Sequence, residues 1–182
     1  KQQFQSSSED IKCLEIAKNC ILGKVYNSRW VLERAIRDHS MQIDVDKVKK
    51  ASIKLKEFLD YIQNSQSMNQ LRGYEGEAAS IYFGVFDELI LQQKKDFFFQ
   101  GRNRRPPLDN VNAMLSFAYT LLAGMCGAAL EGVGLDPYVG FYHTDRPGRM
   151  SLALDLMVEL RSVMADRFVP VSYTHLTLPT KR

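Results

Sequence analysis

The protein has 182 residues, of which 45% are hydrophobic and 25% are charged, enough for one domain with a substantial core. Its 24 Lys and Arg residues against 21 Asp and Glu residues exclude an acidic disordered chain and a strongly basic tail protein. Three cysteines exclude a secreted disulfide scaffold and favour a reducing cytosol. The most apolar segment, 117–130, is shorter than a membrane span, so we expect no membrane association. The chain begins with Lys1 rather than Met, which suggests a fragment.

The chain is expected to be helical over most of its length. Residues 1–8, rich in Gln and Ser, have the composition of a linker. Beyond them, apolar residues spaced by three and four positions predict helices, and Gly and Pro residues mark the loops between them. The expected helices are 9–38, 44–62, 73–92, 109–130 and 151–168. No alternating strand pattern of useful length precedes residue 168, so the predicted fold class is all-α.

The last fourteen residues, 169–182, differ from the rest of the chain. They switch to Val, Thr, Pro and Tyr with no helical period, and they resemble a translated cloning or adapter tail. A short terminal strand is the alternative. We therefore expect one helical domain over 9–168, with a linker before it and a tail foreign to the fold after it.

Glu75 is the first residue that packing alone does not explain. The predicted helix 73–92 gathers its apolar residues on one broad face, and Glu75 projects from the middle of that face. A carboxylate aimed at a core needs a cation, a strong donor or a raised pKa to offset its desolvation. The alternative is that Glu75 lies near water at the helix start and only complements the helix dipole.

His143 lies in GLDPYVGFYHTDRPGR, residues 134–149, a segment too rich in turn-forming residues to be helical. Loops held between helices are where ligands and catalytic groups concentrate, so His143 is a candidate ligand. The alternative is an ordinary surface histidine.

The predicted last helix carries a polar stripe: Ser151, Asp155, Glu159, Ser162 and Asp166. Asp155 and Glu159, at i and i+4, are candidates to face a common cation. An ordinary solvated helix face is the alternative. Val158 lies nearer to this stripe than a valine should.

The types of candidate ligand indicate which metal to expect. Two carboxylates and one imidazole suit Mg²⁺ or Mn²⁺ better than structural zinc, which would need closely spaced Cys or His. The sequence also lacks a glycine-rich phosphate loop after a strand and a serine nucleophile elbow. The GYEG run at 73–76 is therefore not a nucleotide-binding fingerprint.

The segment KKDFFFQGRNRRPP at residues 94–107, named here the basic loop, contains five cations and a single anion, Asp96. The cations are Lys94, Lys95, Arg102, Arg104 and Arg105. Arginine forks suit phosphate oxygens, so the loop is a candidate contact for a nucleic-acid backbone. A solvated loop anchored by its three Phe residues is the alternative. Downstream, Asn112, Ser116 and Tyr119 form a polar seam that would either face the site or satisfy neighbouring helix ends.

Three sequence blocks resemble a known family: LRGYEGEAASIYF, GRNRRPPLDNVNAMLSFAYTLL and GLDPYVGFYHTDRPGRMSLALDLMVELR. They follow the order found in the CRISPR-associated adaptation integrase, the metal-dependent endonuclease that inserts new spacers into a CRISPR array. The similarity covers about residues 9–169. It implies the all-helical catalytic domain of that family without its N-terminal β-rich dimerisation domain.

The resemblance also implies a site for Mg²⁺ or Mn²⁺, with Glu75, His143 and Asp155 as the catalytic candidates. The family's first metal ligand falls on Glu75 and its second on His143. The third is an acidic residue three positions after Asp155, and that position holds Val158. Because valine cannot coordinate a cation, the expected site lacks one anionic oxygen, for which Asp155 or Glu159 is a candidate substitute.

In the reaction that the resemblance implies, a 3′-hydroxyl DNA end attacks a phosphodiester of the array repeat, and water can replace the hydroxyl in a nuclease reaction. The implied partners are free-ended or branched DNA, a second small CRISPR-associated protein, and a second copy of the full-length chain. The implied location is the prokaryotic cytoplasm. Candidate DNA contacts are the cations of the basic loop, Asn112, Arg146 and Arg149. The rival hypotheses are a helical DNA-binding module with a dead site and a helical bundle that serves only protein assembly.

Overall fold

The computed structural model describes residues 1–170. Its α-helices are α1 (Gln2–Ser7), α2 (Asp10–His39), α3 (Val45–Gln63), α4 (Met68–Gly84), α5 (Asn110–Gly132) and α6 (Ser151–Arg161). A 3-10 helix, η1 (Phe86–Leu89), follows α4, and a π-helical segment, η2 (Ser162–Asp166), continues α6. No strand occurs within residues 1–170, so the all-α prediction is confirmed for this part of the chain.

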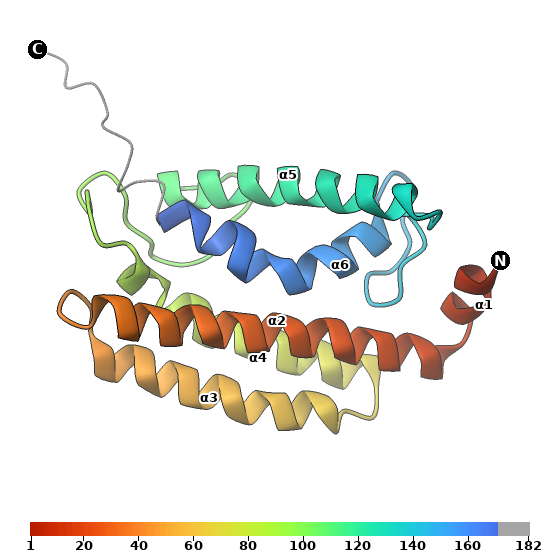
Figure 1. Ribbon diagram of the computed structural model, residues 1–182, viewed down its shortest axis with the longest axis horizontal. Coiled ribbons are helices and arrows are strands. Elements are labelled where there is room, and N and C mark those ends of the chain that lie inside the picture. Colours follow the sequence, from red (N-terminus) through yellow and green to blue (C-terminus); the bar gives the residue numbers. More distant parts are fainter. Residues whose placement is uncertain (171–182) are drawn as a thin grey trace, which may run out of the picture.

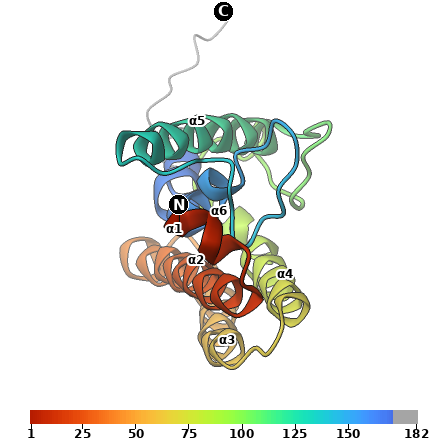
Figure 2. The ribbon, with the colours of Figure 1, turned by 90° about the vertical axis from the view of Figure 1, so that its right-hand side faces the viewer.

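The central helix of the domain is α6. In Figure 1 it lies between α5 and α2, and the end view in Figure 2 shows the same order, with α3 below α2 and α4 beside it. α6 contacts both of its long neighbours, and Leu152, Ala153 and Met157 are buried between them. A helix enclosed in this way places its few polar side chains inside the protein, which positions the site described below.

Three of the helices begin at residues that cap them. The side chains of Asp44, Ser67 and Asp109 each accept a hydrogen bond from a backbone N–H in the first turn of their helix. Such a cap stabilises a helix by about 1 kcal/mol. The cap at Ser67 starts α4 at Met68, five residues before the predicted start at 73. The prediction was late because residues 64–68 have the composition of a turn. α4 also ends earlier, at Gly84, where the chain turns into η1.

Residues 2–7, predicted as part of a linker, instead form α1. The side chain of Gln3 explains its position. Its amide group donates to the carbonyls of Asp136 and Val139 at 2.8 and 3.0 Å, and its carbonyl accepts from the N–H of Asp136 at 3.0 Å. α1 is therefore docked onto residues 133–150, named here the histidine loop, through contacts that local composition cannot predict.

Two further expectations concern α5 and the end of the chain. α5 has 23 residues and is long and apolar enough to cross a membrane, so the short length of segment 117–130 does not exclude a span as predicted; core helices of soluble proteins have the same property. Of the predicted tail 169–182, residues 171–182 lie outside the described part of the chain. Val169 is buried in the core, so the fold includes the first residue of that segment.

Candidate functional site

Asp155 of α6 organises the segment that carries His143. Its Oδ2 accepts hydrogen bonds from the backbone N–H groups of Phe141 (2.7 Å) and Tyr142 (3.0 Å), and its Oδ1 accepts from the backbone N–H of His143 (2.9 Å). Oδ1 also lies 2.6 Å from Nδ1 of the His143 ring. The carboxylate is 1% exposed, so these donors replace water and offset the cost of burying it.

Glu75 of α4 is paired with Lys24 of α2, whose Nζ donates a hydrogen bond to Oε1 of Glu75. Burial, together with the nearby charge of Arg161, lowers the pKa of Lys24 to about 8 despite the opposing effect of Glu75. Burial alone would raise the pKa of Glu75, but the charge and hydrogen bond of Lys24 hold it below its ordinary value. Since α4 begins at Met68, Glu75 lies two turns into the helix, and the alternative of a solvated carboxylate at the helix start is wrong.

Glu75 and His143 belong to one site. One turn before Glu75, the guanidinium of Arg72 in α4 donates to the backbone carbonyl of Tyr142, the residue before His143. The structure thus brings α4 and the histidine loop together from positions far apart in the sequence. Arg161 of α6 lies near Glu75 and is 7% exposed.

The polar stripe predicted on the last helix is buried rather than solvated. Ser151, Asp155, Ser162 and Asp166 are each at most 1% exposed, and Glu159 is the exposed member of the stripe. Neighbouring helices supply their partners. The hydroxyl of Ser162 lies 2.6 Å from that of Ser28 in α2, and Tyr119 of α5 donates a hydrogen bond to Asp166. The alternative of an ordinary solvated face is therefore wrong.

The third position of the implied metal site offers no ligand. Val158 is apolar and 5% exposed. Both oxygens of Asp155 are occupied by the contacts described above, and the side chain of Glu159 lies against Gly23 of α2. Within residues 1–170, no three His, Cys, Asp or Glu side chains form a group that could hold a metal ion. Glu75 and His143 occupy two of the three positions that the resemblance implies, and the described residues offer no third ligand.

A groove gives access to His143, whose side chain is 24% exposed. It is lined by the N-terminal part of α2, the start of α4 and the histidine loop. Arg72 lines this groove, and its Nη2 donates a hydrogen bond to the carbonyl of Tyr142 at 3.2 Å. The groove exposes His143 to solvent, and Glu75 is not among its lining residues.

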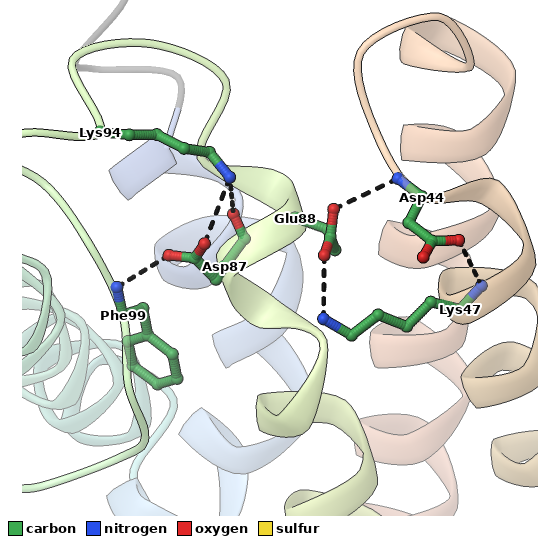
Figure 3. Close-up of polar contacts among 6 residues, drawn as sticks. All are labelled: Asp44, Lys47, Asp87, Glu88, Lys94 and Phe99. Carbon is green, nitrogen blue, oxygen red and sulfur yellow. Dashed lines mark hydrogen bonds and ion pairs between the residues drawn. The ribbon is translucent and has the colours of Figure 1, made fainter.

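The basic loop is anchored to η1. Figure 3 shows the carboxylate of Asp87 accepting from the backbone N–H of Phe99 at 2.8 Å and from Nζ of Lys94 at 3.2 Å. The adjacent Glu88 accepts from Nζ of Lys47 at 2.9 Å, which ties η1 to α3. Phe99 is buried, so the phenylalanine anchor expected of the solvated-loop alternative is present at this residue.

The cations of the basic loop do not all face solvent. Lys95, Arg104 and Arg105 are exposed, and Lys94 is half exposed beside Asp87. Arg102 turns inward, and its Nη1 donates to Oδ1 of Asn112 at 2.7 Å while burial lowers its pKa. Only part of the predicted DNA-contacting set is therefore available at the surface.

Asn112 is fully buried and cannot contact DNA as predicted. Its Oδ1 also accepts from the backbone N–H of Asn103 at 3.1 Å, and its Nδ2 donates to the carbonyl of Gly101 at 2.8 Å. Asn112 thus holds the backbone of the basic loop, whereas the sequence alternative expected the polar seam to satisfy neighbouring helix ends. Of the two remaining arginine candidates, Arg146 is exposed and Arg149 is half buried.

Residues 1–177 match the family described as CRISPR associated protein Cas1. The chain belongs to the Cas1 family. A Cas1 endonuclease of Rhodospirillum rubrum is 55% identical over 157 residues, which cover 84% of this chain and 46% of that protein. One from Leptospira interrogans is 46% identical over 169 residues, covering 93% of this chain and 66% of that protein. The match to the family extends past Val169, into the segment predicted to be foreign to it.

Solved structures support the same fold. A casposase bound to integration product aligns with a TM-score of 0.78 and 28% identity, covering 98% of this chain and 47% of that one. A partial Cas6-RT-Cas1–Cas2 complex aligns with a TM-score of 0.83 and 24% identity, covering 98% of this chain and 51% of that one. This Cas1 chain spans about half the length of those proteins, and the all-helical prediction agrees with the part that it matches.

Lys24 and Arg161 are charged residues of the site that the sequence patterns did not single out. Lys24 lies on the buried stripe of α2, between Ile21 and Ser28, where a lysine on the apolar side of a helical wheel is a usable signal. Arg161 lies at the end of α6, and its guanidinium is 4.8 Å from the ring centroid of Tyr119. Its burial depends on α5 and could not be inferred from α6 alone.

Proposed function

We propose that this chain is the helical catalytic domain of a CRISPR adaptation integrase. The reaction joins 3′-hydroxyl DNA ends to the repeat by phosphodiester transesterification, and it becomes endonucleolytic when water is the nucleophile. The observation that carries the proposal is that α4, which bears Glu75, contacts the accessible loop that bears His143 in a Cas1 chain. The expected setting is the prokaryotic cytoplasm.

The partners follow from the exposed charges and from the relatives. Lys95, Arg104 and Arg105 bind the phosphate backbone of free-ended or branched DNA without reading bases. Two of the similar solved structures are Cas1–Cas2 complexes, so we propose a second small CRISPR-associated protein that bridges dimers of the full-length protein.

Within the site, His143 faces the attacking hydroxyl at the groove, while Lys24 and Arg161 place positive charge beside Glu75. Positive charge fixed in a site of low dielectric stabilises the charge that develops during phosphoryl transfer. Val158 leaves the ligand set incomplete, so we propose that transfer by this sequence is impaired. Mg²⁺ or Mn²⁺ is the cation we expect the site to take once a carboxylate at position 158 supplies the third ligand.

The second candidate function is a catalytically inactive helical DNA-binding module. It is favoured by Val158 at the third ligand position and by the exposed arginines, which need no reaction to bind DNA. It predicts DNA binding without turnover in any metal.

The test is Mn²⁺-dependent cleavage and strand transfer of branched DNA by the full 182-residue chain. We expect Val158→Glu to raise the rate at least ~10-fold, and Glu75→Ala or His143→Ala in that background to return it to the level of buffer. The control is Glu77→Ala, which alters an exposed carboxylate on the same helix and should leave the rate unchanged. Activity that survives both Glu75→Ala and His143→Ala would show that these two residues do not form the catalytic site. DNA binding with no turnover by Val158→Glu would favour the inactive module.

A further inference from the structure

Asp155 makes more contacts than are needed to secure a loop. Hydrogen bonds from the backbone N–H groups of Phe141, Tyr142 and His143 already attach the histidine loop to α6. The contact with the imidazole ring, at 2.6 Å between Oδ1 and Nδ1, is additional. It fixes the side chain of His143 as well as its backbone.

This contact determines which ring nitrogen of His143 carries hydrogen. A carboxylate oxygen has only acceptor capacity, so Nδ1 must be the donor. In the neutral imidazole the lone pair then lies on Nε2, which is the nitrogen available to a ligand. The ring is held from a second side by Tyr142, whose ring centroid is 5.2 Å away at an interplanar angle of 86°.

We propose that Asp155 is a positioning residue that holds His143 in the Nδ1–H tautomer and leaves the lone pair of Nε2 facing the site, where it accepts from the attacking hydroxyl. Asp155 acts through His143 and does not itself bind the ligand, because its oxygens are fully used and its side chain is buried. The inference rests on the proposed function for the identity of the reaction. The tautomer itself can be measured without any reaction.

The experiment is a long-range ¹H–¹⁵N correlation spectrum of the full chain at a pH of about 8.5, where an ordinary imidazole is neutral. His143→Gln identifies the signals of this residue among the three histidines of the sequence. We expect Nδ1 of His143 to be protonated and Nε2 to have the shift of an unprotonated ring nitrogen. Rapid exchange between tautomers, or protonated Nε2 in the unaltered chain, would overturn the proposal without any variant having to fold.

Asp155→Asn provides the second measurement. The oxygen of the new amide should face Phe141 N–H and Tyr142 N–H, because an NH₂ group there would meet two donors, whereas at the Oδ1 position it meets one, the backbone N–H of His143. The NH₂ group then faces Nδ1 of His143, which has to become an acceptor. We expect the hydrogen to move to Nε2 and the ring-nitrogen shifts to exchange. An unchanged tautomer in the folded variant would show that Asp155 only secures the loop.

Asp145→Asn is the matched control, since Asp145 accepts from Gly140 N–H in the same loop and has no contact with the ring. It should leave the tautomer as in the unaltered chain. In the Val158→Glu background, Asp155→Asn should lower kcat at least ~10-fold while DNA affinity stays within about 2-fold. If no variant shows turnover, the proposed function fails while the tautomer result stands. If turnover needs His143 and the tautomer does not depend on Asp155, only the positioning role fails.

Discussion

At the scale of single residues, Lys24 contributes most to the electrostatics of the site. Its ammonium group is nearly excluded from water, with a side-chain exposure of 6%, and the partner that compensates for this burial is Glu75. Removing one partner of a buried pair leaves an uncompensated charge, which costs more than the intact pair contributes. Lys24 and Glu75 should therefore be studied as a pair.

The low pKa of Lys24 predicts a change of stability with pH. Between pH about 8 and 10.5, the unfolded chain holds the Lys24 proton and the folded chain does not, so the free energy of unfolding gains a contribution that rises with pH. Lys24→Met removes the titrating group. We expect the difference in unfolding free energy between the chain and this variant to increase by about 1 kcal/mol per pH unit over that range, measured by urea denaturation. A difference independent of pH would show that Lys24 titrates normally.

At the scale of elements, the decisive contact is between the histidine loop and the first turn of α6. A Cβ atom added at Gly140 would lie 2.6 Å from Cβ of Ser151 and 2.9 Å from the carbonyl oxygen of His143. Only glycine allows this approach, and the approach places the backbone N–H groups of 141–143 within reach of Asp155. The glycine and the aspartate thus secure the same loop from two points.

Gly140→Ala should therefore destabilise the protein. We expect the free energy of unfolding to fall by about 1–3 kcal/mol, because the neighbouring atoms belong partly to backbone and cannot move aside easily. Gly124→Ala is the control. Gly124 lies in α5 with no atom within 4 Å of the added Cβ, so the better helix former should stabilise the protein by up to ~1 kcal/mol. Equal effects of the two substitutions in chemical denaturation would contradict this close contact.

At the scale of the whole molecule, positive charge is concentrated in one segment. Residues 94–105 carry five cations and one anion. Their net charge of +4 exceeds the net charge of +3 of the entire chain. The structure uses Arg102 to hold the loop on α5 and leaves Arg104 and Arg105 exposed. DNA affinity should depend on these two arginines far more than on the total charge.

Replacing Arg104 and Arg105 together by Ala should weaken binding to all DNA sequences equally. We expect the slope of log affinity against log salt to become shallower by about 1–2, because one or two counterions fewer are released. Lys54→Ala is the control, since it removes an exposed cation on α3, away from the basic loop. Fluorescence anisotropy at several salt concentrations measures both. An equal loss in the control would mean that binding follows net charge alone.

The sequence predicts those features of the fold and site that follow from local periodicity, and it does not predict those that depend on contacts between segments distant in the chain. Helical spacing predicts the all-α fold and places Glu75 on the inner face of its helix, because both follow from local periodicity. The docking of α1 through Gln3 and the burial of Asn112 depend on contacts with other segments, whereas composition predicted a linker at Gln3 and Asn112 was expected among the DNA contacts. The same holds for the polar stripe of the last helix, which is buried because α6 lies between α5 and α2.

The site as a whole has the Glu75 and His143 positions of the family and lacks an oxygen ligand at Val158. Mn²⁺ binding, followed by the electron paramagnetic resonance signal of the free ion, tests this most directly and needs no DNA. We expect Val158→Glu to bind Mn²⁺ at least ~10-fold more tightly than the unaltered chain, and Glu75→Ala in the same background to abolish the gain. Equally tight binding by the unaltered chain, lost on Glu75→Ala, would show that the site is already complete and that Val158 is not a missing ligand.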